Sequence, residues 1–260
     1  MDLGLAGKLA VVTGGSKGIG LGVARAFAAE GANVIVTART KDAVADAADA
    51  IARDFGVTAR AVASDVATAE GCAAVAAAAE DMGGADCFVS NAGTGSNETV
   101  MDAPDEKWTA FWDLHVMAAV RLARGLAPGM AAKGGGSMLM NASICAVQPL
   151  WYEPIYNVTK AGLMMFAKCL STEMIPKGIR VNTVNPGLIR TPDWENTARE
   201  LKGDDWEAYL QEVADEHAPI RRFGTVEELA DVVVFLSSPR AAYVVGSAWH
   251  VDGGMLRTNA

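Results

Sequence analysis

The sequence has little of what builds a metal centre or a disulfide framework. Its 260 residues include only four cysteines and three histidines, no CxxC motif is present, and the histidines are scattered. Zinc sites and small disulfide-rich domains need closely paired Cys or His residues. We therefore expect reduced thiols, no metal site and no disulfide.

Long apolar runs and an excess of positive charge are also missing. No stretch approaches the roughly 18 apolar residues of a membrane span, and the start MDLGLAGKLA lacks the pattern of a secretory signal. Asp and Glu outnumber Lys and Arg by 31 to 22, for a formal net charge of −9. This balance disfavours nucleic acid and anionic membranes as partners. We expect a soluble cytoplasmic protein, in which a local basic pocket could still hold a small anion.

What the sequence does contain is a regular alternation of β-rich and helical segments. Several of the strand candidates are nearly continuous apolar runs, as in strands covered on both faces. The predicted strands are Leu9–Thr13, Asn33–Thr37, Thr58–Ala63, Asp86–Ser90, Ser137–Asn141, Arg180–Asn185 and Ala248–Val251. The predicted helices are 18–30, 41–54, 68–81, 105–131, 155–175 and 225–237. The alternation predicts an α/β fold: a doubly wound, Rossmann-like parallel sheet of about seven strands with helices on both faces.

No linker or repeat divides the chain, so residues 1–260 are expected to form a single domain. One stretch interrupts the alternation: between Thr191 and Arg222 there is no strand signal but many charges and three large aromatic residues. An insertion of this kind favours a functional lid, here over about residues 192–220, rather than a plain surface loop.

A glycine-rich turn, TGGSKGIG at residues 13–20, follows the first predicted strand directly. Gly14 allows a sharp turn, and Gly18 and Gly20 remove side chains that would hold a pyrophosphate away from the helix start. The helix N-terminus then offers free N–H groups and a partial positive charge to phosphate. The spacing differs from GxGxxG, and such a turn alone can be merely geometric. Its position after the first strand of an alternating chain favours nucleotide binding.

This turn resembles that of the short-chain dehydrogenase/reductase family, and further matching blocks follow in order. They are Asp65-Val66, Asn91-Ala92-Gly93, Ser143 with Tyr156 and Lys160, Asn185-Pro186-Gly187 with Thr191, and Val251-Asp252-Gly253-Gly254. Together they span residues 8–254. Ser90, where the family usually has Asn, is a mild departure. The resemblance implies a nicotinamide cofactor bound by Gly14, Ser16, Lys17, Gly18, Ile19, Gly20, Arg39, Asp65, Val66, Asn91, Ala92, Gly93, Tyr156, Lys160, Pro186, Gly187, Ile189 and Thr191.

The end of the second strand bears on which nicotinamide is used. An acidic residue there would bind both ribose hydroxyls and repel a 2′-phosphate. This chain has Ala38 at the position where NAD-preferring relatives carry Asp, and Arg39 follows it. Arg39 can pair with a phosphate, and Lys17 points to the same region in relatives that use NADP. We predict NADP(H); the alternative is two unrelated surface cations and an NAD-linked enzyme.

Tyr156 and Lys160 are four residues apart in a helical segment, so they share one face. A nearby ammonium is expected to lower the pKa of the phenol and make it a general acid and base. Such pairs are common on helices, and in isolation they are usually structural. With Ser143 thirteen residues upstream, as in the family, the resemblance implies that Ser143 binds the substrate carbonyl. It also implies that Lys160 binds the nicotinamide ribose.

A departure from the family lies at His115, in the stretch Asp113-Leu114-His115-Val116, where relatives usually have a catalytic Asn. In relatives the main-chain carbonyl here holds a relay water. A histidine could keep that role and titrate in its own right, so we count it with the catalytic set. The alternative is a histidine packed in the helix.

The predicted substrate site is lined by residues that follow the strands. They are Thr94, Gly95, Ser143, Ile144, Gln148, Trp151, Tyr152, Leu188 and Trp194. The aromatic residues favour a hydrophobic carbonyl or alcohol substrate, although Trp151 and Trp206 could instead fill a subunit interface. A 3-oxoacyl carrier-protein substrate is a further option.

The segment 155–175 is apolar on more than one side, which predicts a second subunit against it. The family resemblance implies a homo-oligomer, a tetramer or a dimer. The leading hypothesis is an NADP(H)-dependent oxidoreductase that transfers hydride between nicotinamide and a carbonyl or secondary alcohol. The alternatives are an NAD-linked catabolic dehydrogenase and a non-catalytic dinucleotide-binding sensor.

Overall fold

The computed structural model describes residues 1–150 and 152–258 and contains one seven-stranded sheet. The strands are β1 (Leu9–Thr13), β2 (Asn33–Ala38), β3 (Ala59–Ala63), β4 (Cys87–Ser90), β5 (Gly136–Asn141), β6 (Ile179–Pro186) and β7 (Ala248–Val251). Their order is β3-β2-β1-β4-β5-β6-β7, and every neighbouring pair is parallel. Each predicted strand is present, so the predicted fold class is confirmed.

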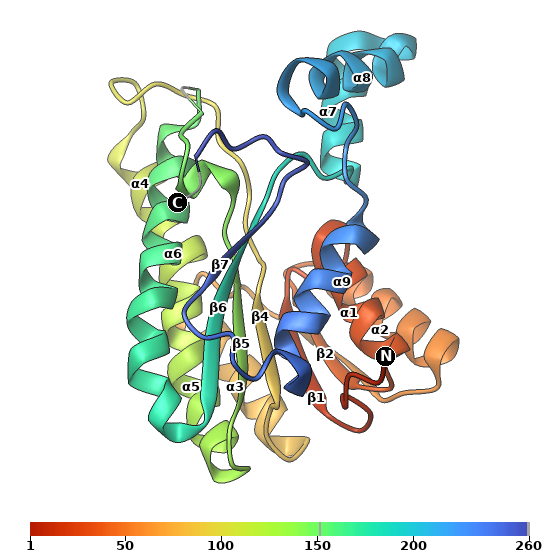
Figure 1. Ribbon diagram of the computed structural model, residues 1–260, viewed down its shortest axis with the longest axis vertical. Helices are drawn as coiled ribbons and strands as arrows, with labels where there is room; N and C mark the ends of the chain where they lie inside the picture. Colours follow the sequence, from red (N-terminus) through yellow and green to blue (C-terminus); the bar gives the residue numbers. More distant parts are fainter. Residues whose placement is uncertain (151, 259–260) are drawn as a thin grey trace.

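Helices cover both faces of the sheet (Figure 1). They are α1 (Gly18–Ala29), α2 (Lys41–Phe55), α3 (Ala69–Asp81), α4 (Asp105–Trp112), α5 (Ala118–Ala132), α6 (Pro154–Met174), α7 (Pro192–Lys202), α8 (Trp206–His217) and α9 (Val226–Ser237). In Figure 1, α3, α5 and α6 lie on one side of the sheet and α1, α2 and α9 on the other, whereas α7 and α8 project above it.

Two buried cores follow from this layering. Successive side chains of β1 point to opposite faces, so Leu9 and Val11 join one core whereas Ala10 and Val12 join the other. Leu122 and Met130 of α5 belong to the first core, and Phe27 of α1 belongs to the second. Burial on both faces explains why the central strands read as continuous apolar runs.

The helical segment predicted over 105–131 is not a regular α-helix. Between α4 and α5 lies one π-helical turn, Asp113–Met117, which contains His115. A π-helical turn inserts a residue into the helical repeat, which apolar periodicity does not reveal, and such turns are frequent at functional sites. The stretch predicted as a lid forms α7 and α8, so it is helical rather than irregular.

The order of the strands places a topological switch between β1 and β4. The connection from β1 runs to β2 on one side, whereas β4 continues to β5 on the other. Ligands of doubly wound folds bind at the carboxyl ends of the strands at this point. The glycine turn, Asn91 and Ser143 follow β1, β4 and β5 respectively, so they all lie along this edge.

Candidate active site

The glycine turn has the backbone geometry that its composition predicts. Gly14 and Gly18 have φ angles of 66° and 54°, in the left-handed region that favours glycine. A Cβ on Gly20 would lie 2.2 Å from the carbonyl oxygen of Gly14, so only glycine fits there. Helix α1 begins without a side-chain cap and without an acidic residue in its first turn. Its N-terminus therefore suits a phosphate group.

Asn91 joins the ends of three strands. Its Nδ2 donates to the carbonyl oxygen of Thr13 at 2.9 Å, and its backbone N–H donates to the Thr13 hydroxyl at 2.9 Å. Asn141, at the end of β5, donates to Asn91 Oδ1 at 2.7 Å. Asn91 therefore fixes the ends of the central strands relative to one another. Asn141 was missed in the sequence analysis, because it reads there as an ordinary strand end.

The two cations expected near a 2′-phosphate lie in different surroundings. Arg39 is exposed and forms no ion pair with any residue that the structure describes. Lys17 instead lies 2.5 Å from Asp193 Oδ1, at the start of α7. Ala38 ends β2, and Asp65 Oδ1 accepts a hydrogen bond from the backbone N–H of Ala67. The glycine turn, the uncapped helix and the missing acid at position 38 together fit a phosphorylated dinucleotide.

The structure brings Ser143, Tyr156 and Lys160 together. The Ser143 side chain follows β5 and lies near enough to the phenol of Tyr156, at the start of α6, to affect its pKa. Lys160, one turn further along α6, has its Nζ 5.4 Å from the centre of the Tyr156 ring and donates to the Asn141 carbonyl at 2.8 Å. Ser143 and Lys160 are almost completely buried.

The pKa of Tyr156 departs from the expectation. Burial raises the pKa of this phenol, and Ser143 opposes the rise only in part. Burial lowers the pKa of Lys160 to about 8, so its ammonium stays mostly charged at neutral pH. The expected lowering of the phenol pKa is therefore wrong for this structure, because the loss of water around the phenol dominates and the charge of Glu153 adds to the rise. A phenol of this kind is protonated at neutral pH.

His115 is almost completely buried and joins three elements of the site. Its Nε2 accepts from the backbone N–H of Thr94 at 3.2 Å, and its Nδ1 lies 2.8 Å from Thr159 Oγ1 on α6. Since the Thr159 hydroxyl donates to the Ile155 carbonyl, Nδ1 carries the proton. Burial and the charge of Lys160 lower the pKa of His115 to about 2. The idea that His115 titrates in the working range is therefore wrong; it is a neutral link between α6 and the loop after β4.

An acidic residue beside the phenol, Glu153, was missed in the sequence analysis. Burial raises the pKa of Glu153 to about 7, and the charge of Glu98 adds to the rise. Glu153 lies close enough to Tyr156 for its charge to raise the pKa of the phenol. Glu98 is paired with Lys107 of α4. A signal was available: Glu153 directly precedes the Pro154 that begins α6, three residues before Tyr156.

The loop between β5 and α6 is held at several points. The Asn157 side chain accepts from the backbone N–H of Leu150 at 3.2 Å and donates to its carbonyl at 2.5 Å. The Tyr152 carbonyl accepts from the backbone N–H of Glu98, and Gln148 Oε1 accepts from that of Arg257. Predicted substrate residues Gln148 and Tyr152 thus lie on a tethered loop. Trp151 was also predicted to line the site, but it lies outside the described residues.

The remaining predicted residues lie around the same edge of the sheet. Ile144 is buried beside Ser143, whereas Thr94 and Gly95 are exposed on the loop after β4. Pro186 ends β6, and Gly187, Leu188 and the buried Ile189 follow it. Thr191 caps α7, and Trp194 packs edge-on against Phe223 with ring centres 5.3 Å apart.

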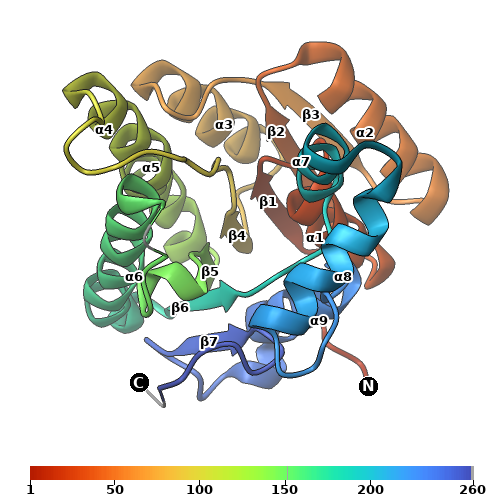
Figure 2. The same cartoon turned by 90° about the horizontal axis from the view of Figure 1, so that it is seen from above.

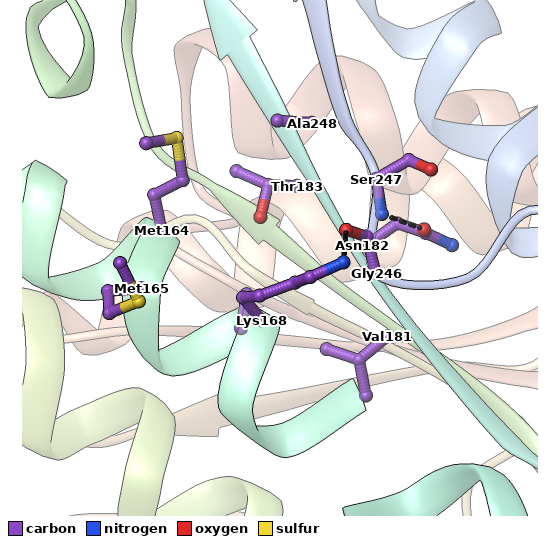
Figure 3. Close-up of a pocket in the computed structure, with 10 residues that line it drawn as sticks. Met164, Met165, Lys168, Val181, Asn182, Thr183, Gly246, Ser247 and Ala248 are labelled. Atoms are coloured by element: carbon purple, nitrogen blue, oxygen red, sulfur yellow. Dashed lines mark hydrogen bonds between the residues drawn. The ribbon is translucent and has the colours of Figure 1, made fainter. Parts of the chain in front are cut away.

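A groove of about 200 Å³ lies elsewhere on α6 (Figure 3). Met164, Met165 and Lys168 line it from the helix, facing Val181 and Thr183 of β6 and the segment before β7. These residues of β6 lie toward its amino end, away from the edge that carries Ser143. The groove is therefore separate from Ser143, Tyr156 and Lys160.

Two absences concern the described part of the chain, residues 1–150 and 152–258. None of its helices is long and apolar enough to cross a membrane. None of its His, Cys, Asp and Glu side chains gather in a group of three or more that could hold a metal ion.

Comparisons with known proteins agree with this geometry. The family model described as enoyl-(acyl carrier protein) reductase matches residues 14–256. The 3-oxoacyl-[acyl-carrier-protein] reductase of Vibrio cholerae is 34% identical over 97% of this chain and 99% of its own. The chain belongs to the short-chain dehydrogenase/reductase family. The family resemblance seen in the motifs is thereby confirmed, and the protein is an oxidoreductase of this family.

Solved structures of relatives extend the comparison. L-sorbose reductase from Gluconobacter frateurii, complexed with NADPH and L-sorbose, is 62% identical, with a TM-score of 0.98 over 99% of this chain and 100% of its own. A 7α-hydroxysteroid dehydrogenase complexed with NADH and a 7-oxo bile acid is 30% identical, with a TM-score of 0.88 over 100% of this chain and 98% of its own. The NADPH complexes among these relatives agree with the predicted NADP(H) cofactor. The NADH complex shows that the fold alone does not decide between the two.

Proposed function

We propose that this protein is an NADPH-dependent reductase of small polyhydroxy ketones, with Tyr156 as its general acid. The observation that carries the substrate class is the half-buried carboxyl of Glu153 beside the Tyr156 phenol. A buried carboxyl is costly unless polar groups pair with it, and a bound polar ligand would add such partners to the backbone N–H of Ser96. Sugar hydroxyls provide such partners, and a relative that is 62% identical is an L-sorbose reductase. We therefore favour a polar ketone over the hydrophobic substrate expected from the aromatic residues.

The catalytic residues are suited to reduction. Bound NADPH would supply the hydride that reduces the carbonyl carbon. Ser143 donates a hydrogen bond to the carbonyl oxygen and holds it near the phenol. Because its pKa is raised, Tyr156 carries its proton at neutral pH and gives it to the oxygen as negative charge develops there.

Lys160 supports this proton transfer electrostatically. With a pKa of about 8, its buried ammonium is charged at neutral pH and stabilises the phenolate that the transfer leaves behind. Its hydrogen bond to the Asn141 carbonyl fixes its position at the end of β5. In this site it is also the cation available to the nicotinamide ribose. A non-catalytic sensor could lose Ser143, Tyr156 or Lys160 without cost. Because all three residues are present, we favour an enzyme.

The preference for NADPH over NADH is part of the proposal. Arg39 is exposed at the end of β2 and has no carboxylate partner among the described residues, so it is available to a 2′-phosphate. Binding of NADPH and NADH, followed by nicotinamide fluorescence, tests this part. We expect tighter NADPH binding, and Arg39→Asp should weaken it and improve NADH binding. Equal affinities in the unaltered protein would contradict the preference.

The substrate class is tested by assaying NADPH oxidation with three groups of carbonyl compounds. Ketohexoses, including L-sorbose, form the first group; aromatic ketones and 3-oxoacyl thioesters form the others. We expect the highest kcat/KM with a ketohexose. A higher kcat/KM with an aromatic ketone would contradict this proposal and support the hydrophobic substrate expected from the sequence. A 3-oxoacyl thioester as the best substrate would contradict it in favour of fatty-acid chemistry.

Three further features belong to the same proposal. Val158 and Met165 of α6 are about half exposed in the single chain, which supports a homo-oligomer, a tetramer or dimer, that covers this helix. Free cysteines at positions 72, 87, 145 and 169 fit a reducing compartment such as the cytoplasm. In this proposal the protein is a single-domain enzyme, and helices α7 and α8 act as its lid.

A further inference from the structure

Lys17 lies in the glycine turn and is paired with an acidic residue of α7. It is the residue immediately before α1, and its backbone is extended there. Its side chain is 63% exposed, so it can move between partners. The partner it has in this structure is a carboxylate: Nζ lies 2.5 Å from Asp193 Oδ1.

Asp193 lies in the first turn of α7, directly above the glycine turn. Figure 2 shows α7 over the start of α1, and a Cβ on Gly18 would lie 3.8 Å from the side chain of Thr191. The other acid in this turn, Glu195, is already paired with Arg190 and Arg199. Within the described ranges, 1–150 and 152–258, Lys17 is the cation paired with Asp193.

We propose that Asp193 is a positioning residue that sets the choice between NADPH and NADH by competing with the 2′-phosphate for Lys17. This inference rests on the proposed preference for NADPH. While the ammonium is paired with Asp193, Arg39 is the only one of the two cations free to meet the phosphate. NADPH must draw Lys17 away from Asp193 to gain its second contact, whereas NADH has no 2′-phosphate and makes no such demand.

The size of the effect follows from the exposure of the pair. Exposed ion pairs contribute little, because water and salt screen them and long side chains lose freedom in forming them. Releasing Lys17 from such a pair should therefore tighten NADPH binding by about two- to five-fold, the range that corresponds to an exposed pair. The effect should shrink as ionic strength rises.

The test is a double-mutant cycle on cofactor affinity. The unaltered protein, Asp193→Asn, Lys17→Ala and the double variant are titrated with NADPH and with NADH at low ionic strength. We expect Asp193→Asn to tighten NADPH binding and leave NADH binding unchanged. In the Lys17→Ala background the same substitution should have no effect on NADPH, because the competition acts only through Lys17.

Two controls separate this mechanism from simpler ones. Asp205→Asn removes an exposed acid from the same lid and should change neither affinity; thermal unfolding of each variant shows that the lid substitutions leave the fold intact. The proposal is overturned if Asp193→Asn leaves NADPH affinity unchanged, alters both cofactors equally, or still acts without Lys17. None of these results affects the proposed function, which fails separately if the unaltered protein binds NADH as tightly as NADPH.

Discussion

The imidazole of His115 and the hydroxyl of Thr159 lie 2.8 Å apart, and both side chains are almost completely buried. This contact links the π-helical turn to α6, which carries Tyr156 and Lys160. The backbone N–H of Thr94 donates to the other ring nitrogen, Nε2. Each ring nitrogen therefore has a hydrogen-bond partner, and a proton on Nε2 would break the bond from Thr94. His115 therefore links the π-helical turn to α6 as a neutral group.

The neutrality of His115 predicts a pH dependence of stability. In the unfolded chain its pKa is near 6.5, whereas in the folded chain it is about 2, so the unfolded state binds the extra proton between these values. Stability is therefore full above about pH 6.5 and falls with acid by up to about 1.4 kcal/mol per pH unit. Urea unfolding of the unaltered protein and of His115→Asn from pH 7 to pH 5 measures this. The free energy of unfolding of the variant should lack the part of the pH dependence that one extra proton causes. If the free energies of the two proteins instead changed with pH in parallel, His115 would be protonated in the folded protein.

A second pH dependence concerns substrate recognition by Glu153. The raised pKa of about 7 means that this carboxyl becomes charged only near neutral pH, and a carboxylate binds hydroxyl groups more strongly than a neutral acid does. We expect kcat/KM for a ketohexose to rise with pH through about 7. Glu153→Gln should lower kcat/KM and remove the step.

Glu98→Gln provides the matched variant for that step. Because the charge of Glu98 raises the pKa of Glu153, its removal should move the step to lower pH without abolishing it. A profile that is unchanged in Glu153→Gln would exclude this carboxyl from substrate binding.

The folded state also depends on a buried cation that no acid neutralises within the described chain. Arg180 on β6 donates to the carbonyl oxygens of Leu236 and Ser238 at 2.9 Å each, at the end of α9. Arg180→Leu leaves these carbonyls buried without donors and should lower the free energy of unfolding by about 3 kcal/mol. The exposed Lys177→Leu, measured in the same urea titration, should change it by less than about 0.5 kcal/mol. A small effect at Arg180 would show that water replaces the guanidinium.

The sequence predicted the strands and the layering, and it identified most residues of the candidate site, because these depend on local patterns. Apolar runs mark the buried strands, and the spacing of Tyr156 and Lys160 is fixed by the helix that carries them. The π-helical turn around His115 was not predictable, since one extra residue leaves the apolar pattern almost unchanged. The raised pKa of Tyr156, the burial of Glu153 and the pairing of Lys17 with Asp193 depend on segments distant in sequence, and only the folded chain brings these together.

The most direct test of the account is the turnover of Tyr156→Phe with NADPH and the best ketohexose substrate. The change removes only the hydroxyl that is proposed to give its proton to the substrate oxygen, so NADPH affinity should stay within about two-fold. Turnover should fall by about 100-fold or more, the size of effect expected for a lost general acid. Near-normal turnover with intact NADPH binding would contradict the account.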